Sequence, residues 1–178
     1  GNEIVFTSNR EIPAAQDWDN IYFAPASGSS VVKYTKLEYS KYGLYIDTVS
    51  PPVENCTIQK SYYGMWLKGG STSSITSNII SENIDRDIHI DNSSPTITNN
   101  TMISTSAGKY GVVVMGTSVL PAKPIVNNNS IYGHTSEDMY AKSSSGDLSL
   151  IKIDAQGNWW GTTDTKQISI KILDYNEG

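Results

Sequence analysis

Two short hydrophobic patterns alternate along the chain. The first has an apolar residue, an Asn-like residue three positions later, and a second apolar residue two positions after that. It occurs six times, and its Asn-like positions are Thr35, Cys56, Asn78, Asn100, Asn129 and Asn158. These positions lie 21, 22, 22, 29 and 29 residues apart, so the pattern is a repeat.

The second pattern has two apolar residues separated by one other residue, with Gly or a polar residue before them. It occurs seven times, at 20–23, 43–46, 64–67, 87–90, 111–114, 138–141 and 167–170. Strands this short cannot bury a face alone, but stacked coils close a continuous core. A strand repeat of little more than twenty residues therefore predicts an all-β solenoid of about seven coils, forming one domain over 1–178.

Three stretches resemble a known family. They are IVFTS at 4–8 with Trp18-Asp19-Asn20-Ile21 after it, SPTITNNTM at 94–102, and NWWGTTDT at 158–165 leading into ILDY at 172–175. These stretches are similar to right-handed parallel β-helix proteins of the pectate-lyase-like superfold, particularly the repeat-bearing surface and secreted proteins of bacteria and archaea. The resemblance implies the fold but not the function, because that superfold includes lyases, hydrolases, epimerases, adhesins and structural rods.

The resemblance also bears on what surrounds the chain. In relatives of this kind, earlier coils precede the IVFTS run and the NWWG coil lies near the end of the helix. We therefore expect a piece of a longer protein that lacks its natural end caps and has neighbouring domains as partners. Bare end coils would otherwise invite pairing with other strands.

The charge of the chain limits the classes of partner it can bind, and its cysteine content limits its disulfide chemistry. Thirteen Lys and Arg against 18 Asp and Glu give a net charge of −5, which argues against nucleic acid or an anionic membrane. The low charged fraction of 17% fits an extracellular β protein, so we expect a secreted or cell-surface location. No stretch is long enough to span a bilayer. The single Cys56 excludes an internal disulfide, and its place in the Asn-like column predicts a buried, unreactive thiol.

The residue between the two apolar positions of the second pattern points outward, because side chains alternate along a strand. This outward row is Tyr22, Tyr45, Trp66, His89, Val113, Tyr140 and Ser169. A second row precedes it at the turn: Tyr42, Tyr63, Arg86 and Tyr110. Exposed rings with hydroxyl edges suit stacking against sugars, and the resemblance implies that this strand lines a polysaccharide groove. The alternative is an aromatic ladder that stabilises the sheet by about 0.2–1 kcal/mol per pair and binds nothing.

The next outward row contains candidates for catalysis. It is Ala24, Asp47, Lys68, Asp91, Met115, Lys142 and Lys171. The resemblance implies a calcium ion held by acids on such a strand and a Lys or Arg base, which gives Asp87 and Asp91 as ligands beside Lys68 or Arg86. Only two acids align, where such sites gather three or more. A solvated ion-pair ladder is the alternative.

His89 is a candidate metal ligand. Asp87 and Asp91 flank it at two-residue spacing, which predicts that the three side chains share a face and form a weak transition-metal site. The alternative is an exposed histidine without a ligand. His134 lies in a turn with no evident partner, so no catalytic triad follows from the two histidines. Apart from that calcium ion or weak metal site, we expect no cofactor.

The Asn-like column is expected to be structural, because stacked amides can hydrogen-bond from one coil to the next. The connections at 115–124 and 143–150 are longer than their counterparts and lie on one side of the rod, where repeat proteins commonly bind ligands. These features favour a surface or secreted module that binds polysaccharide along the aromatic row. The alternatives are a fragment of a polysaccharide lyase or glycoside hydrolase, and a structural spacer or adhesin stalk without a small ligand.

Overall fold

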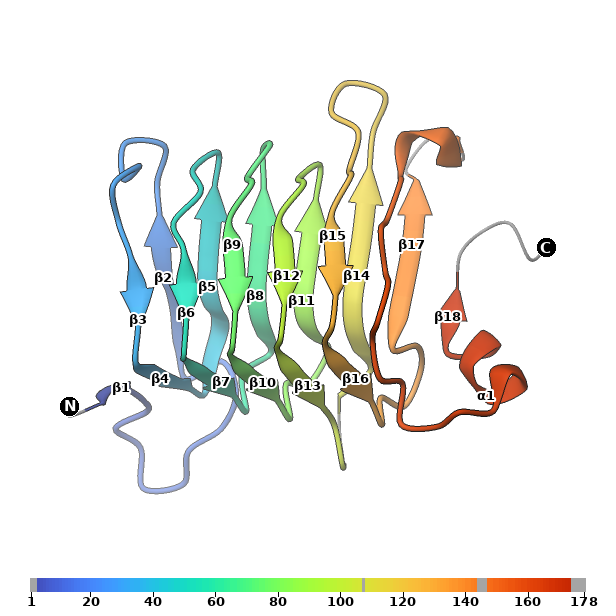
Figure 1. The fold of residues 1–178 in the computed structure, drawn as a ribbon. Helices are drawn as coiled ribbons and strands as arrows, with labels where there is room; N and C mark the ends of the chain where they lie inside the picture. The colour runs from blue at the N-terminus through green and yellow to red at the C-terminus, as the bar shows by residue number, and fades with distance from the viewer. Residues whose placement is uncertain (1–2, 107, 144–146, 174–178) are drawn as a thin grey trace.

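The chain winds into a parallel β-solenoid with three sheets, seen in the computed structural model, which describes residues 3–106, 108–143 and 147–173 (Figure 1). The seven-stranded sheet contains β2 (Trp18–Phe23), β5 (Ser40–Asp47), β8 (Tyr63–Lys68), β11 (Arg86–Asp91), β14 (Tyr110–Gly116), β17 (Met139–Ser143) and β18 (Ile172–Leu173). The five-stranded sheet contains β3 (Val32–Lys33), β6 (Val53–Glu54), β9 (Ser74–Thr76), β12 (Thr96–Thr98) and β15 (Ile125–Asn127). The six-stranded sheet contains β1 (Ile4–Phe6), β4 (Thr35–Glu38), β7 (Thr57–Gln59), β10 (Ile79–Ser81), β13 (Thr101–Ile103) and β16 (Ser130–Tyr132).

Five turns carry a strand on all three sides, fewer than the seven coils expected from the repeat. A sixth turn is incomplete, because after β17 and a 3-10 helix at Leu148–Leu150 it continues through isolated bridges at Ile151, Asp154 and Trp159 before β18. Every strand pair that joins one turn to the next is parallel. The expected all-β solenoid is confirmed, although it has fewer complete turns than predicted because the C-terminal turn is irregular.

The seventh copy of the second pattern is not a strand. Residues Thr165–Ser169 form a short helix, α1, and the Asp164 side chain caps its N-terminus by accepting a hydrogen bond from the Lys166 N–H at 2.9 Å. The strand comes later, at β18, where Leu173 rather than Ser169 lies beside Tyr140. The Asp164 cap, together with the good helix formers Lys166 and Gln167, favours the helix over a strand here. The ILDY run ends outside the described residues, which stop at Leu173.

The core is a continuous column of apolar side chains inside the coil. In the turn that begins with β11, the seven-stranded sheet contributes Ile88 and Ile90, and the other two sheets contribute Ile97 and Met102, all fully buried. Each such side chain stabilises the fold by about 1.5–3 kcal/mol. Four buried apolar residues per turn is the number that the sequence repeat predicts.

The Asn-like column forms the expected ladder between the five-stranded and six-stranded sheets. The amide of each asparagine donates to the next one along the stack, at 2.9 Å from Asn78 to Asn100, 3.0 Å from Asn100 to Asn129 and 3.1 Å from Asn129 to Asn158. The residue before each column position turns the chain with a positive φ: these are Tyr34, Asn55, Ser77, Asn99, Asn128 and Gly157. Asparagine tolerates this left-handed conformation better than most residues.

Cys56 occupies the same column and is buried, with its thiol 3.3 Å from the Glu54 carbonyl. Burial raises the pKa of this thiol, which disfavours the reactive thiolate. We expect the folded protein to react slowly with a colourimetric thiol reagent, and the urea-unfolded protein to react at once. Fast labelling without denaturant would instead show that the turn at Cys56 opens readily.

The longer connections lie at one edge of the rod. The loop after β14 and the 3-10 helix after β17 both extend from the upper edge in Figure 1. Of the connection expected at 143–150, residues 144–146 lie outside the described residues. Within the described part of the chain, no helix is long and apolar enough to cross a membrane.

Candidate functional site

The outer face of the seven-stranded sheet carries two rows of large side chains in register. Strand pairing places Tyr22, Tyr45, Trp66, His89, Val113 and Tyr140 side by side in successive turns. It also aligns Tyr42, Tyr63, Arg86 and Tyr110 in a second row. We call their aromatic members the aromatic strip: Tyr22, Tyr42, Tyr45, Tyr63, Trp66, Tyr110 and Tyr140. The order of residues in both rows is therefore the predicted one, up to Tyr140.

Rings of the strip pack against one another. Tyr22 stacks on Tyr45 with centroids 5.1 Å apart, and Tyr45 lies 5.3 Å from Trp66 at an angle of 50°. Tyr42 meets the edge of Trp66 at 5.2 Å, which joins the two rows. These offset and edge-on arrangements are the ones that aromatic pairs prefer.

The rings of the strip are less exposed to solvent than the sequence predicts. Tyr22 is 50% exposed, whereas the other six rings are half-buried. His89 and Val113, expected on the surface, are only 3% and 2% exposed, so the prediction of an exposed His89 is wrong. The reason is lateral packing: Trp66 meets the His89 ring edge-on at 5.2 Å, and Tyr63 lies 5.9 Å from it.

Arg86 lies at the centre of the second row. Its guanidinium is 4.9 Å from the centre of the Tyr63 ring and 6.0 Å from that of Tyr110, and its Nη1 is 2.5 Å from His89 Nδ1. Burial, and then the charge of Arg86, lower the pKa of His89 to about 3. His89 is therefore neutral and accepts the hydrogen bond from Arg86. A carboxylate also lies 3.0 Å from Arg86 Nε, on Asp85.

The charged row beside the strip is partly an ion-pair ladder. Lys68 Nζ lies 3.1 Å from Asp47 Oδ2 and 5.2 Å from the centre of the Tyr45 ring. Hydrogen bonding to Tyr45 and Asp47 raises the pKa of Lys68, so this residue stays a cation and is poorly suited to act as a base. Asp91 accepts a hydrogen bond from the Asn92 amide, and burial raises its pKa.

Asp87 does not join His89 and Asp91 in a metal site. Its carboxylate turns into the protein and contacts Asn83 at 2.8 Å and His134 at 3.1 Å, whereas His89 lies under the strip. In the described part of the chain, no group of three or more His, Cys, Asp or Glu side chains is arranged to hold a metal ion. The prediction that the three candidate ligands share a face is wrong, because Asp87 and the next residue, Ile88, are both buried, so the simple in-and-out alternation fails at this end of β11.

His134, which has no evident partner in the sequence, is the centre of a buried cluster. Its Nε2 lies 3.1 Å from Asp87 Oδ2, and its Nδ1 lies 2.8 Å from Asp138 Oδ1. All three side chains are almost completely buried. We call Asp87, His134 and Asp138 the acid–histidine cluster. A sequence signal does exist for it, because both aspartates occupy a position that is glycine in three other turns.

The glycine between the two aspartates makes room for the imidazole. A Cβ atom at Gly111 would lie 3.0 Å from His134 Cε1 and 2.4 Å from the Asp138 carbonyl oxygen. Burial opposes a charge on His134, but its hydrogen bonds with Asp138 and Asp87 and their charges outweigh this and raise its pKa to about 9. Burial also raises the pKa of Asp87, which disfavours its charged form and so opposes the ion pair. We assign the proton to His134, because each of its two ring nitrogens faces a carboxylate oxygen.

Comparison with known proteins agrees with the architecture. Residues 14–158 match the family model described as right handed beta helix region. Searches of the curated proteins and of the solved structures gave no match. The matched region spans the five complete turns and most of the incomplete one. With its three parallel sheets and stacked asparagines, the chain belongs to the right-handed β-helix family.

Proposed function

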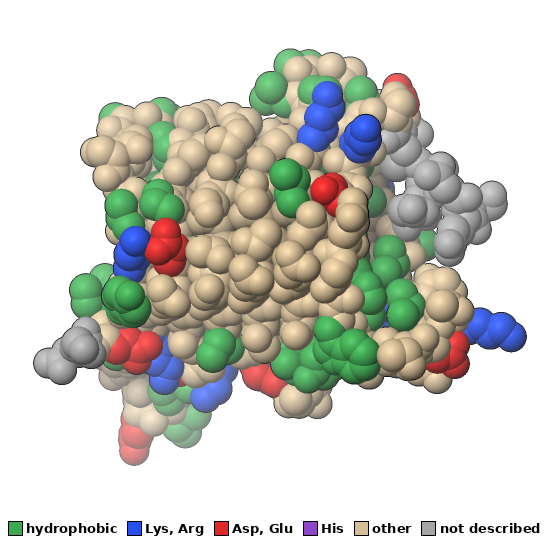
Figure 2. All heavy atoms as spheres, viewed as in Figure 1, with side chains coloured by type: hydrophobic (Ala, Val, Ile, Leu, Met, Phe, Trp, Pro, Cys, Tyr) green, Lys and Arg blue, Asp and Glu red, His purple; other side chains and the backbone are tan. Residues whose placement is uncertain are grey.

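We propose that this β-helix module binds polysaccharide non-covalently on the outer face of the seven-stranded sheet, as part of a secreted or cell-surface protein. The observation that carries the proposal is the confinement of the aromatic strip to one sheet. Outer positions of the five-stranded sheet hold mainly small polar residues, such as Ser74, Thr76, Thr96 and Thr98. Figure 2 views that sheet and shows few charged or hydrophobic side chains across its middle.

A ladder that served only to stabilise strands would have no reason to prefer one sheet, since tyrosine favours any strand. Seven aromatic side chains instead form one line, two rows wide, across β2, β5, β8, β14 and β17, with a gap at β11. Rings with apolar faces and hydroxyl edges suit the mixed apolar and polar surface of a sugar. The line runs across the strands, so a glycan chain lying on it would extend along the rod.

The binding stretch is expected over β2, β5 and β8. Tyr22, Tyr45 and Trp66 lie there in consecutive turns, with Tyr42 and Tyr63 beside them. The row is interrupted at His89 and Val113, which are buried, and only Tyr110 and Tyr140 continue it further along, 5.7 Å apart. Lys41 lies 5.0 Å from the Tyr42 ring and adds a hydrogen-bond donor at the margin.

The test is affinity electrophoresis and pull-down on a panel of soluble and insoluble polysaccharides. We expect a double variant, Tyr45→Ala with Trp66→Ala, to bind about 5- to 150-fold more weakly, because two rings at about 0.5–1.5 kcal/mol each amount to about 1–3 kcal/mol. Circular dichroism must show that the variant is folded. Tyr34→Asn is the matched control, because Tyr34 is an exposed tyrosine outside the strip with positive φ.

A structural spacer or stalk is the second candidate. The mutual packing of the strip's rings, with centroids 5.1–5.9 Å apart, is the observation that favours it. If neither the wild type nor the Tyr34→Asn control binds any polysaccharide of the panel, the spacer is the better account. Equal binding by the wild type and the double variant would place the glycan elsewhere on the module.

A further inference from the structure

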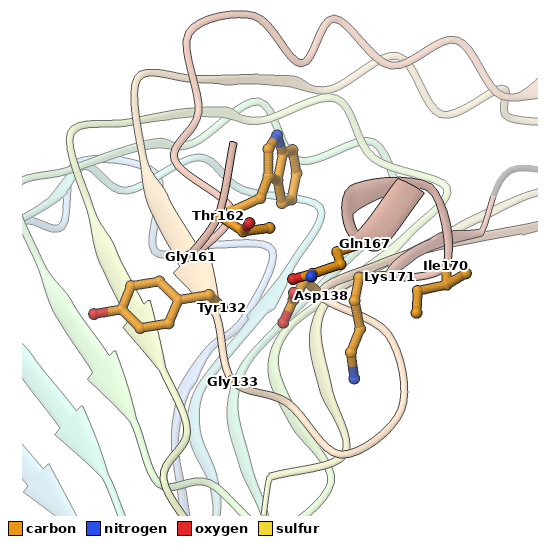
Figure 3. Close-up of a pocket in the computed structure, with 9 residues that line it drawn as sticks. Tyr132, Gly133, Asp138, Gly161, Thr162, Gln167, Ile170 and Lys171 are labelled. Atoms are coloured by element: carbon orange, nitrogen blue, oxygen red, sulfur yellow. The ribbon is translucent and has the colours of Figure 1, made fainter. Parts of the chain in front are cut away.

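A pocket lies at the C-terminal end of the rod, apart from the aromatic strip. It has a volume of about 410 Å³ and is bounded by the turn between β16 and β17, the segment after Trp160, and the residues from α1 to β18 (Figure 3). This volume is at the small end of the range for ligand pockets. The pocket would therefore hold one or two sugar-sized rings rather than a long chain.

A buried carboxylate borders the pocket with one oxygen unused. Asp138 is 2% exposed, and both hydrogen bonds from His134 go to its Oδ1, from the backbone N–H at 3.2 Å and from Nδ1 at 2.8 Å. Among the described residues, none donates a hydrogen bond to its Oδ2. Oδ2 is not one of the fully buried atoms without a partner, so this oxygen is open to a donor in the pocket. Figure 3 shows the Gln167 carboxamide directed towards the same point from α1.

The charges around the pocket cancel. Lys171, which also borders it, donates from Nζ to the carbonyls of His134 at 2.7 Å and Ser136 at 2.8 Å. The pocket and the acid–histidine cluster beside it together hold two carboxylates, Asp87 and Asp138, and two cations, the His134 imidazolium and Lys171. A charged ligand would leave one charge unbalanced in a site that is already neutral, which is costly where side chains are buried.

One aromatic side chain completes the pocket. Half-buried Trp160 lines it together with Ile170, whereas Figure 3 shows the Tyr132 ring turned away from Asp138 and Gln167. An indole surface near a carboxylate and a carboxamide matches a ligand with an apolar face and several hydroxyl donors. We infer that this pocket binds a neutral sugar unit, whose hydroxyls donate to Asp138 Oδ2 and to the Gln167 side-chain oxygen. This inference does not rest on glycan binding by the strip.

The test is a titration of the whole chain, followed by amide and indole NMR signals, with methyl glycosides of glucose, galactose and mannose. We expect saturable shifts at Gly133, Gly161 and Trp160 with at least one neutral glycoside. Methyl glucuronoside, which carries a carboxylate, should bind more weakly. Gln167→Trp, which fills the pocket from an exposed position, should abolish the shifts.

Two controls separate this site from the strip. Lys166→Ala changes an exposed residue of the same helix that does not line the pocket, and it should leave the shifts intact. The strip double variant at Tyr45 and Trp66 should also keep them, whatever its effect on polysaccharide binding. The inference is overturned if no neutral glycoside shifts these signals, or if Gln167→Trp leaves the shifts unchanged.

Discussion

Replacing His134 with alanine is expected to lower the free energy of unfolding by about 3–5 kcal/mol, because it removes the cation from two buried carboxylates. Among the described residues, Asp87 would keep a hydrogen bond only from the Asn83 amide, because the Nε2 donor is lost. Asp138 would lose the bond from Nδ1 and keep the one from the backbone N–H of residue 134. Urea unfolding at neutral pH, followed by circular dichroism, measures the loss. It should be the largest single-residue effect of the acid–histidine cluster.

The same cluster predicts a loss of stability in alkali. The pKa of His134 is raised from 6.5 to about 9 in the folded protein, so its contribution is fully present below the unfolded pKa and is lost as pH rises through about 9. The wild type should therefore weaken between neutral pH and that range, and His134→Ala should not show this dependence. His89→Gln is the control, because the other buried histidine is neutral at these pH values.

Two results would contradict the ion-paired cluster. One is wild-type stability that stays flat from neutral pH to well above the His134 pKa. The other is a His134→Ala variant as stable as the wild type, which would mean that the two aspartates take up protons at little cost. Either result would show that a carboxyl group, rather than the His134 imidazole, carries the proton in the folded protein.

Asn100→Ala is expected to lower the free energy of unfolding by about 3 kcal/mol or more, since each buried group left without a partner costs about 1–3 kcal/mol. The Asn100 side-chain oxygen accepts from the backbone N–H and the amide of Asn78, both at 2.9 Å. Its amide donates to the carbonyl of Ile75 at 2.9 Å and to Asn129 at 3.0 Å. Alanine removes all four of these bonds. The Asn78 amide keeps its bond to the Val53 carbonyl, and Asn129 keeps the one from the backbone N–H of residue 100, but the Asn78 backbone N–H loses its acceptor inside the coil.

Asn99 provides the matched control for this prediction. It precedes Asn100 in the chain, is exposed, and has a φ of 58°, which glycine adopts without strain. Asn99→Gly should therefore change the urea midpoint much less than Asn100→Ala. Similar losses in the two variants would show that the turn conformation, rather than the buried ladder, sets the stability of this column.

The sequence repeat was sufficient to predict the core and the ladder. Inward residues such as Ile88 and Ile90, and the stacked Asn78 and Asn100, depend only on the position within a coil, which the period of the repeat fixes. The neighbours of Trp66 along the strip follow from the same register. A strictly periodic chain therefore reveals which side chains stack.

Other features depend on packing between positions that the period does not relate. His89 is buried because the rings of Trp66 and Tyr63 pack against it. The alternation of inward and outward residues along a strand does not predict such contacts between neighbouring strands. His134 finds Asp87 from 47 residues away, and the two belong to different columns of the repeat. At the C-terminal end the repeat pattern is weaker, and the Asp164 cap favours a helix at Thr165–Ser169 instead of the predicted strand.

The acid–histidine cluster also bears on how the rod comes apart. In most solenoids the energy is a sum of terms between adjacent repeats, so that terminal repeats can fray one after another. His134 instead connects Asp87 at β11 with Asp138 at β17, on either side of β14. Because loss of any one member would leave a buried charge in a neighbouring turn, we expect the turns from β11 to β17 to unfold together rather than one after another.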